Sequence, residues 1–194
     1  MTVAPAAERF KRAEWASAFR NVEQELSAVP VKPSRGTVPA ELLGTLYRNG
    51  PGRLERAGQR VHHPFDGDGM ITALRFDAGG VSLTNRFVRT AGWQAEEAAG
   101  KVLYRGVFGS QKPGGRLANA FDLRLKNIAN TGVIRLGDQL LALWEAAEPH
   151  ALDPHSLDTH GICLLGGVLR VRRSVPIPAS IQVITTVPAW SPLV

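Results

Sequence analysis

The chain has 194 residues, 44% of them hydrophobic, which is enough for one core or for part of a larger domain. Its formal net charge of +6 lies partly in the region after Asp158, the last acidic residue. No stripe of basic residues interleaved with aromatics is present, which argues against nucleic-acid binding. The single cysteine, Cys163, excludes an intrachain disulfide and favours a reducing compartment.

The N-terminal region contains neither an apolar leader nor a run of 18 apolar residues. The sequence therefore predicts a cytoplasmic protein, and surface association with a membrane stays open. Large apolar residues recur at helical spacing over residues 7–28, namely Trp15, Phe19, Val22 and Leu26. This spacing predicts an amphipathic helix that packs on a neighbouring body, or alternatively one that lies on a membrane surface.

Residues 29–41 contain three prolines and predict an extended linker. Short strands and turns follow it. Residues 44–50 predict a strand that ends in an Asn-Gly turn. The alternation of apolar and polar residues predicts hairpins over 70–88 and 133–144. We further expect a short helix over 91–100 and a strand within 161–171.

Several short antiparallel strands separated by turns indicate an all-β fold. A sandwich, a barrel and a propeller all fit the pattern, and periodicity does not choose among them. The motif Asp66-Gly67-Asp68-Gly69 is predicted to be a tight turn between strands. It lacks the following glutamate and the flanking helices of a calcium-binding EF-hand.

The apolar run from Leu140 to Trp144 ends in Glu145. If this strand is buried, the carboxylate needs a donor, because an unpaired buried charge is costly. A lysine, an arginine or a backbone turn would satisfy it. A second interpretation is that Glu145 accepts the free ring N–H of a metal-bound imidazole and so fixes its orientation. The residues alone leave both interpretations open.

The five histidines do not form a metal-ligand pattern. His62 and His63 are adjacent, so on a strand their side chains point to opposite faces. The other three, at positions 150, 155 and 160, are spaced five residues apart around a loop rich in proline and aspartate. Surface or loop histidines are therefore the simpler interpretation, and the sequence predicts no metal ligand in this chain.

Six segments, taken together and in this order, resemble the carotenoid cleavage oxygenases, most closely the bacterial apocarotenoid-cleaving type. The resemblance spans about residues 37–165. The segments are Gly44–Gly52, His63–Met70, Phe87–Thr90, Lys126–Thr131, Leu143–Glu145 and Leu152–Thr159.

This resemblance implies a seven-bladed β-propeller with an axial Fe(II) held by four histidines, three of them oriented by glutamates. The enzymes of the family are dioxygenases that cleave a polyene double bond into two carbonyl products. Their apolar substrate enters through a tunnel, and an apolar surface patch touches the membrane. By the same resemblance, Glu145 matches one orienting glutamate and Trp144 matches a tunnel-lining, substrate-binding position.

The chain departs from the family pattern in length and in its C-terminal region. The first iron histidine is expected just after residue 170, where the sequence reads Arg-Val-Arg-Arg-Ser. We therefore expect an N-terminal fragment that contains only the first blades and binds no iron alone. The expected division is a helix and linker (1–36), a partial propeller (37–170) and an aberrant or unstructured tail (171–194).

The expected function is that of an Fe(II)-dependent carotenoid or apocarotenoid dioxygenase, with this chain inactive alone. Open blade edges are expected to make it prone to aggregation. The alternative is a noncatalytic interaction module derived from a propeller. The expected partner is an apolar polyene; the sequence indicates neither a particular polyene nor an oligomeric state.

Overall fold

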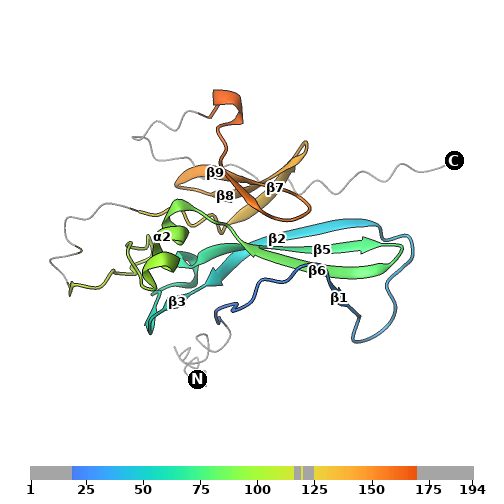
Figure 1. Cartoon of the computed structure of the whole chain (residues 1–194), viewed down its shortest axis with the longest axis horizontal. Helices are drawn as coiled ribbons and strands as arrows, with labels where there is room; N and C mark the ends of the chain where they lie inside the picture. The colour runs from blue at the N-terminus through green and yellow to red at the C-terminus, as the bar shows by residue number, and fades with distance from the viewer. Residues whose placement is uncertain (1–18, 116–118, 120–124, 170–194) are drawn as a thin grey trace, which may run out of the picture.

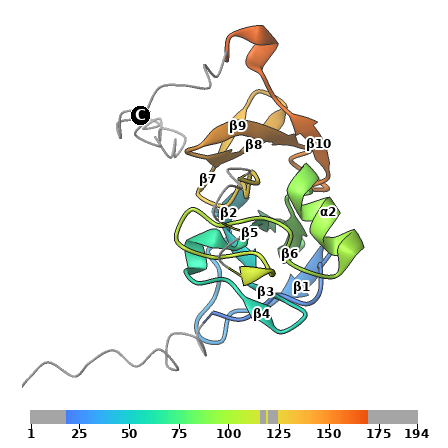
Figure 2. The same cartoon turned by 90° about the vertical axis from the view of Figure 1, so that its left-hand side faces the viewer.

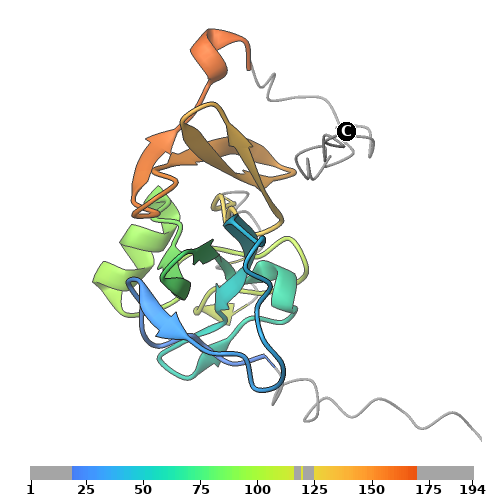
Figure 3. The same cartoon turned by 90° about the vertical axis from the view of Figure 1, so that its right-hand side faces the viewer.

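The computed structural model describes residues 19–115, 119 and 125–169. Their main features are two antiparallel four-stranded sheets (Figure 1). The first has the strand order β1-β6-β5-β2 and the second β10-β9-β8-β7. Figures 2 and 3 show the second sheet on one side of the first, with helix α2 (Ala91–Ala99) alongside. The predicted all-β class is confirmed for the described residues.

The first sheet is built around the hairpin of β5 (Asp68–Asp77) and β6 (Gly80–Phe87), which confirms the hairpin predicted over 70–88. Strand β2 (Gly44–Arg53) pairs with β5 along its length. The Asn-Gly turn predicted at its end is wrong, because β2 continues through Pro51 and forms a bulge before Arg53. A proline is tolerated there because β2 is an edge strand.

The second sheet contains β7 (Gly132–Leu136) and β8 (Gln139–Trp144), the second predicted hairpin. Strands β9 (Ala147–Leu152) and β10 (Thr159–Ile162) complete it. The strand predicted within 161–171 ends at residue 162, and a 3-10 turn, η2 (Leu165–Gly167), follows it. Three consecutive residues of η2 have positive φ, which extended backbone cannot accommodate.

The amphipathic helix predicted over 7–28 is wrong for residues 19–28, which form no helix; residues 1–18 lie outside the described residues. The backbone N–H of Val22 donates to Gly52 at 2.8 Å. Leu26 exchanges hydrogen bonds with Asn85 of β6, and its carbonyl also accepts from Arg86. Backbone groups that a helix would pair internally are therefore used to bind this segment to the first sheet.

Part of the predicted linker is also ordered, since β1 (Val29–Val31) pairs with β6. A two-stranded hairpin, β3 (Glu55–Arg56) and β4 (Gln59–Arg60), extends from the end of β2. A 3-10 turn, η1 (Pro64–Asp66), then leads into β5, where the sequence predicted only a tight turn. The predicted helix over 91–100 is confirmed as α2, capped by the Thr90 hydroxyl and by left-handed Gly100.

The hydrophobic core lies where the two sheets meet. Its fully buried side chains come from both sheets and from the segments between them: Ile71, Ala73, Val88, Ala129, Leu140, Ala142, Leu152 and Leu157. Tyr47 of β2 packs against this cluster, and its hydroxyl donates to the Pro154 carbonyl at 2.8 Å. The two sheets are thus joined through one continuous core, which fixes the geometry of the segment that crosses between them.

Candidate functional site

The crossing segment, residues 126–132, is called the strap. It enters the second sheet at β7 and runs against the start of β5, where the Gly69 N–H donates to the Ile128 carbonyl at 2.8 Å. Ala129 is fully buried and has φ +44°, an unfavourable conformation for a residue with a Cβ. The Asn127 side chain supports it by accepting from the Ala129 N–H at 3.0 Å.

Two asparagines hold the strap from the first sheet and η1. The Asn49 amide donates to the carbonyls of Ala129 and Gly132, at 2.9 and 2.8 Å. The Asn130 amide, on the strap itself, donates to the carbonyls of Phe65 and Gly67, at 2.9 and 2.7 Å. Each amide thus joins its own segment to two carbonyls of a neighbouring one, and the strap is fixed on both sides.

Thr131 and Glu145 meet at the far end of the strap. The Thr131 N–H and hydroxyl both donate to the Leu143 carbonyl, at 3.1 and 2.9 Å. The same hydroxyl lies 3.2 Å from a Glu145 carboxylate oxygen. Glu145 is exposed, in the turn between β8 and β9. The burial considered for its carboxylate is wrong, because the strand ends one residue before it.

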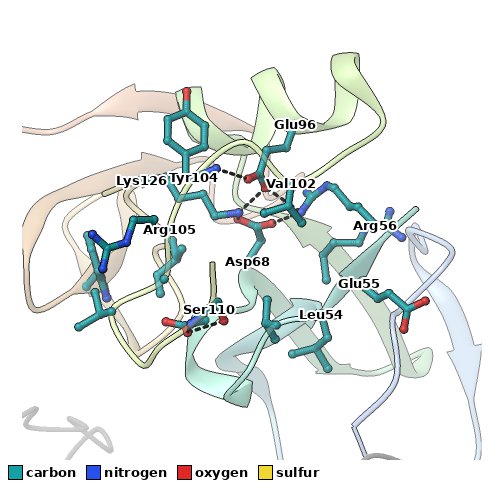
Figure 4. A pocket seen from close by; sticks show the side chains of 17 residues that line it. Leu54, Glu55, Arg56, Asp68, Glu96, Val102, Tyr104, Arg105, Ser110 and Lys126 are labelled. Atoms are coloured by element: carbon teal, nitrogen blue, oxygen red, sulfur yellow. Dashed lines mark hydrogen bonds and ion pairs between the residues drawn. The ribbon is translucent and has the colours of Figure 1, made fainter. Parts of the chain in front are cut away.

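Trp144, the predicted substrate-binding residue, is half-buried and lines a cavity. The space open to the centre of a water molecule there is about 20 Å³. That is room for about one water. Within the described residues, this cavity is therefore far too small for a polyene. Its walls include Leu54, Val102, Tyr104 and Lys126 (Figure 4).

Two buried carboxylates and two largely buried cations meet beside this cavity, and the sequence alone did not predict this cluster. Lys126, the first residue of the strap, places its Nζ 2.8 Å from Asp68 and 2.5 Å from Glu96. Arg56 donates to the same two carboxylates at 2.8 and 3.0 Å (Figure 4). Glu96, fully buried on α2, also accepts from the N–H of Leu103.

The cluster is balanced, with two cations and two carboxylates. Burial tends to lower the pKa of the Arg56 guanidinium, but Asp68, Glu96 and Glu97 outweigh it and raise that pKa above its ordinary value. The cluster joins β3, β5, α2 and the strap. Nothing in the local sequence marks it, because its members are far apart along the chain and only the fold brings them together.

The described residues contain no group of three His, Cys, Asp or Glu side chains that would hold a metal ion. His150 is buried, with its Nδ1 3.4 Å from the Asn127 amide, and burial lowers its pKa. His63 caps η1, and His155 contacts Arg75. Because the donor side chains do not converge in a group of three, the described part of the chain does not fit an iron centre by itself.

None of the described helices is long and apolar enough to cross a membrane.

A family comparison matches residues 19–184 to the retinal pigment epithelial membrane protein family. The apocarotenoid-15,15'-oxygenase of Synechocystis is 49% identical over 169 residues, which is 87% of this chain and 34% of that protein. The chain belongs to the carotenoid oxygenase family. Carotenoid cleavage dioxygenase 7 of rice is 35% identical over 68% of the chain and 22% of its own length. The chain thus spans about a fifth to a third of the relatives it matches.

Solved structures give the same family. A Synechocystis apocarotenoid oxygenase variant superimposes with a TM-score of 0.77 at 49% identity, over 83% of this chain and 34% of the other. Carotenoid oxygenases are β-propellers, so the two four-stranded sheets correspond to part of a propeller that is not closed here. The solved variants include replacements of a glutamate by glutamine, a tryptophan by alanine and a threonine by alanine.

Proposed function

We propose that this chain forms the first part of an Fe(II)-dependent dioxygenase that cleaves a double bond of an apocarotenoid. The observation that carries the proposal is the 49% identity to the Synechocystis enzyme over most of this chain. The tryptophan and glutamate replaced in that enzyme are consecutive, as Trp144 and Glu145 are here. The replaced threonine precedes that tryptophan by the same interval as Thr131 precedes Trp144.

Glu145 has the role of an orienting carboxylate in this proposal. It would accept the ring N–H of an iron-bound histidine contributed from outside the described residues. Such a hydrogen bond fixes the tautomer and the angle of a ligating imidazole. Two observations support this role: the carboxylate is exposed in the turn directly after strand β8, and Thr131 approaches one of its oxygens at 3.2 Å. The other oxygen stays available for an imidazole.

The proposed substrate is an apolar polyene, and Trp144 would contact it. The cavity that Trp144 lines holds about one water, so the substrate site would need further walls from outside the described residues. The alternative of a noncatalytic module gains no support from the Synechocystis and rice relatives, which are named as an oxygenase and a dioxygenase.

We also propose that an exposed aromatic cluster contacts a membrane surface, where such a substrate dissolves. Phe65 and Phe108 are 55% and 47% exposed, with ring centroids 5.7 Å apart, and Val107 beside them is 51% exposed. Replacing both phenylalanines by serine is expected to reduce co-sedimentation with neutral lipid vesicles. The control is Leu136→Ser, a similarly exposed residue in β7. Equal sedimentation of both variants and the parent would contradict this contact.

A graft tests the proposed activity. Residues 19–169 of this chain replace the matching segment of the Synechocystis apocarotenoid-15,15'-oxygenase, and iron content and aldehyde release from an apocarotenal are measured. The graft is expected to bind iron and to turn over, and Glu145→Gln in the graft is expected to lower kcat at least tenfold. The 194-residue chain alone is expected to do neither.

A control variant and two possible results decide whether the proposed reaction holds. Glu148→Gln, a nearby half-buried glutamate in β9, is expected to leave the activity of the graft unchanged. A graft that folds and binds iron but releases no aldehyde would refute the proposed reaction. Stoichiometric iron and turnover in the 194-residue chain would refute the need for ligands from elsewhere.

A further inference from the structure

We infer that Asn49 and Asn130 are positioning residues that aim the Thr131 hydroxyl at Glu145, acting through the strap. Neither asparagine touches Glu145 itself. The inference rests on the proposed function only for the chemical role of Glu145; the mechanical linkage stands on the contacts of the described residues.

The Asn49 side chain controls where the strap lies against the first sheet. Its amide group has two N–H donors, and both are used, on the carbonyls of Ala129 and Gly132. These two carbonyls flank Thr131 along the chain. Strand β2, which carries Asn49, is held to β5 by a long ladder of pairs. A rigid strand therefore fixes the backbone on each side of Thr131.

Asn130 fixes the same backbone from the opposite direction. The residue is 5% exposed, and both of its N–H donors go to backbone carbonyls, those of Phe65 in η1 and of Gly67 directly after η1. Because Asn130 immediately precedes Thr131, a rotation of its backbone would move the Thr131 hydroxyl directly. Buried amides with satisfied donors are costly to displace, so this orientation is strongly preferred.

The backbone of the strap is held in an unfavourable conformation. Ala129 has φ +44° with its Cβ fully buried, and Gly69 leaves no room behind it, since a Cβ there would lie 2.1 Å from the Ala129 oxygen. Strain of this kind persists only where the surroundings over-determine the conformation, and it concentrates at functional sites. Here the surroundings include the Asn49 amide, the Asn127 side chain and the backbone of Gly69.

The hydroxyl of Thr131 shows why its position matters. It has one proton and two acceptors in reach, the Leu143 carbonyl at 2.9 Å and Glu145 at 3.2 Å. A small displacement of the strap would commit the proton to one acceptor. The torsion angles of the Glu145 side chain would then change. Its second carboxylate oxygen, which the proposed function assigns to an imidazole, would point in another direction.

The test uses the 194-residue chain, labelled with ¹³C and ¹⁵N. Three-bond couplings to the Thr131 Cγ2 report the side-chain rotamer, and the carboxyl ¹³C shift reports the surroundings of Glu145. Asn49→Ala and Asn130→Ala are each expected to average the couplings and to move the Glu145 shift toward its value in Thr131→Val. Amide exchange at Thr131 is expected to accelerate at least tenfold.

Asn85→Ala is the matched control, because Asn85 is 7% exposed and its side chain also bonds to backbone, at Leu26. It is expected to lower stability without moving the Thr131 couplings or the Glu145 shift. If Asn49→Ala does not fold, Asn130→Ala decides alone. If a folded Asn49→Ala or Asn130→Ala variant keeps the Thr131 couplings and the Glu145 carboxyl shift of the parent, the inference is overturned.

The graft separates this inference from the proposed function. In an active graft, Asn49→Ala is expected to lower kcat at least tenfold with KM within about twofold, whereas Asn85→Ala changes neither. An inactive parent graft would refute the proposed function, and the couplings measured in the 194-residue chain would still decide the linkage. Full activity of Asn49→Ala in an active graft would overturn the positioning role.

Discussion

Replacement of Lys126 by methionine is expected to destabilise the protein strongly. The side chains of the cluster are little exposed: Lys126 is 10% exposed, Arg56 8%, Asp68 2% and Glu96 1%. Methionine preserves much of the volume but removes one of two cations, so two buried carboxylates are left with Arg56 alone. Breaking a buried ion pair by removing one partner costs about 3–5 kcal/mol.

That cost is large relative to the total stability of a domain, which is typically about 5–15 kcal/mol. For a domain of this size it corresponds to a fall in Tm of about 6–20 °C, at about 2–4 °C per kcal/mol. The assay is denaturant unfolding of the 194-residue chain, followed by tryptophan fluorescence. Lys101→Met, at an exposed lysine, is the control and is expected to change the free energy of unfolding by about 0.5 kcal/mol at most.

A double variant sharpens the test. Glu96→Gln alone leaves two cations facing Asp68, but Lys126→Met combined with Glu96→Gln leaves one cation and one carboxylate, so charge balance returns. The double variant is therefore expected to be more stable than the sum of the two single effects predicts, by about 0.5–3 kcal/mol. Additive effects, or a Lys126→Met variant as stable as Lys101→Met, would refute the interpretation of these four charges as one coupled, desolvated unit.

Three further predictions concern stability in the same unfolding assay. Gly69→Ala is expected to cost about 1–3 kcal/mol or more, because its Cβ would lie 2.1 Å from the Ala129 oxygen, whereas Gly50→Ala, with open space around it, is expected to be tolerated. Leu140→Ala is expected to cost about 2–5 kcal/mol, since Leu140 is fully buried; a smaller loss would mean that the core collapses onto the gap. Burial lowers the pKa of His150, so the unfolded chain binds a proton more readily and the free energy of unfolding falls as pH drops below about 6.5. His150→Gln is expected to flatten this dependence of stability on pH, and an unchanged dependence would contradict the prediction.

The two hairpins and the short helix followed from local sequence because their signals are local. Alternating residues and tight turns predict β5–β6 and β7–β8, and the capping hydroxyl of Thr90 starts α2 where the pattern expected a helix. The predictions failed where distant segments decide the backbone. Residues 19–28 have a helical pattern, but their N–H and carbonyl groups bind the first sheet instead.

In the candidate site, too, some residues were predicted from the sequence and others were found only in the structure. Trp144 and Glu145 were selected from the sequence through the family resemblance, and the structure places them at the end of β8 and in the following turn. The graft described above tests their proposed roles. The segment Lys126–Thr131 carried part of the family resemblance, but no individual role was predicted for Thr131 or for the asparagines of the strap. An asparagine in a loop carries no local signal that distinguishes a residue clamping a distant segment from a turn residue.

The sequence by itself determined the family, the all-β class and two of the hairpins, β5–β6 and β7–β8, because ordered motifs and period-two patterns lie within short stretches of chain. Only the tertiary structure showed that Arg56, Asp68, Glu96 and Lys126 form one buried unit, and that Asn49 reaches across to the strap. The physical reason is that ion pairing and amide hydrogen bonding act over about 3 Å in space and are indifferent to separation along the chain. Which partners meet is therefore decided by the packing of the two sheets.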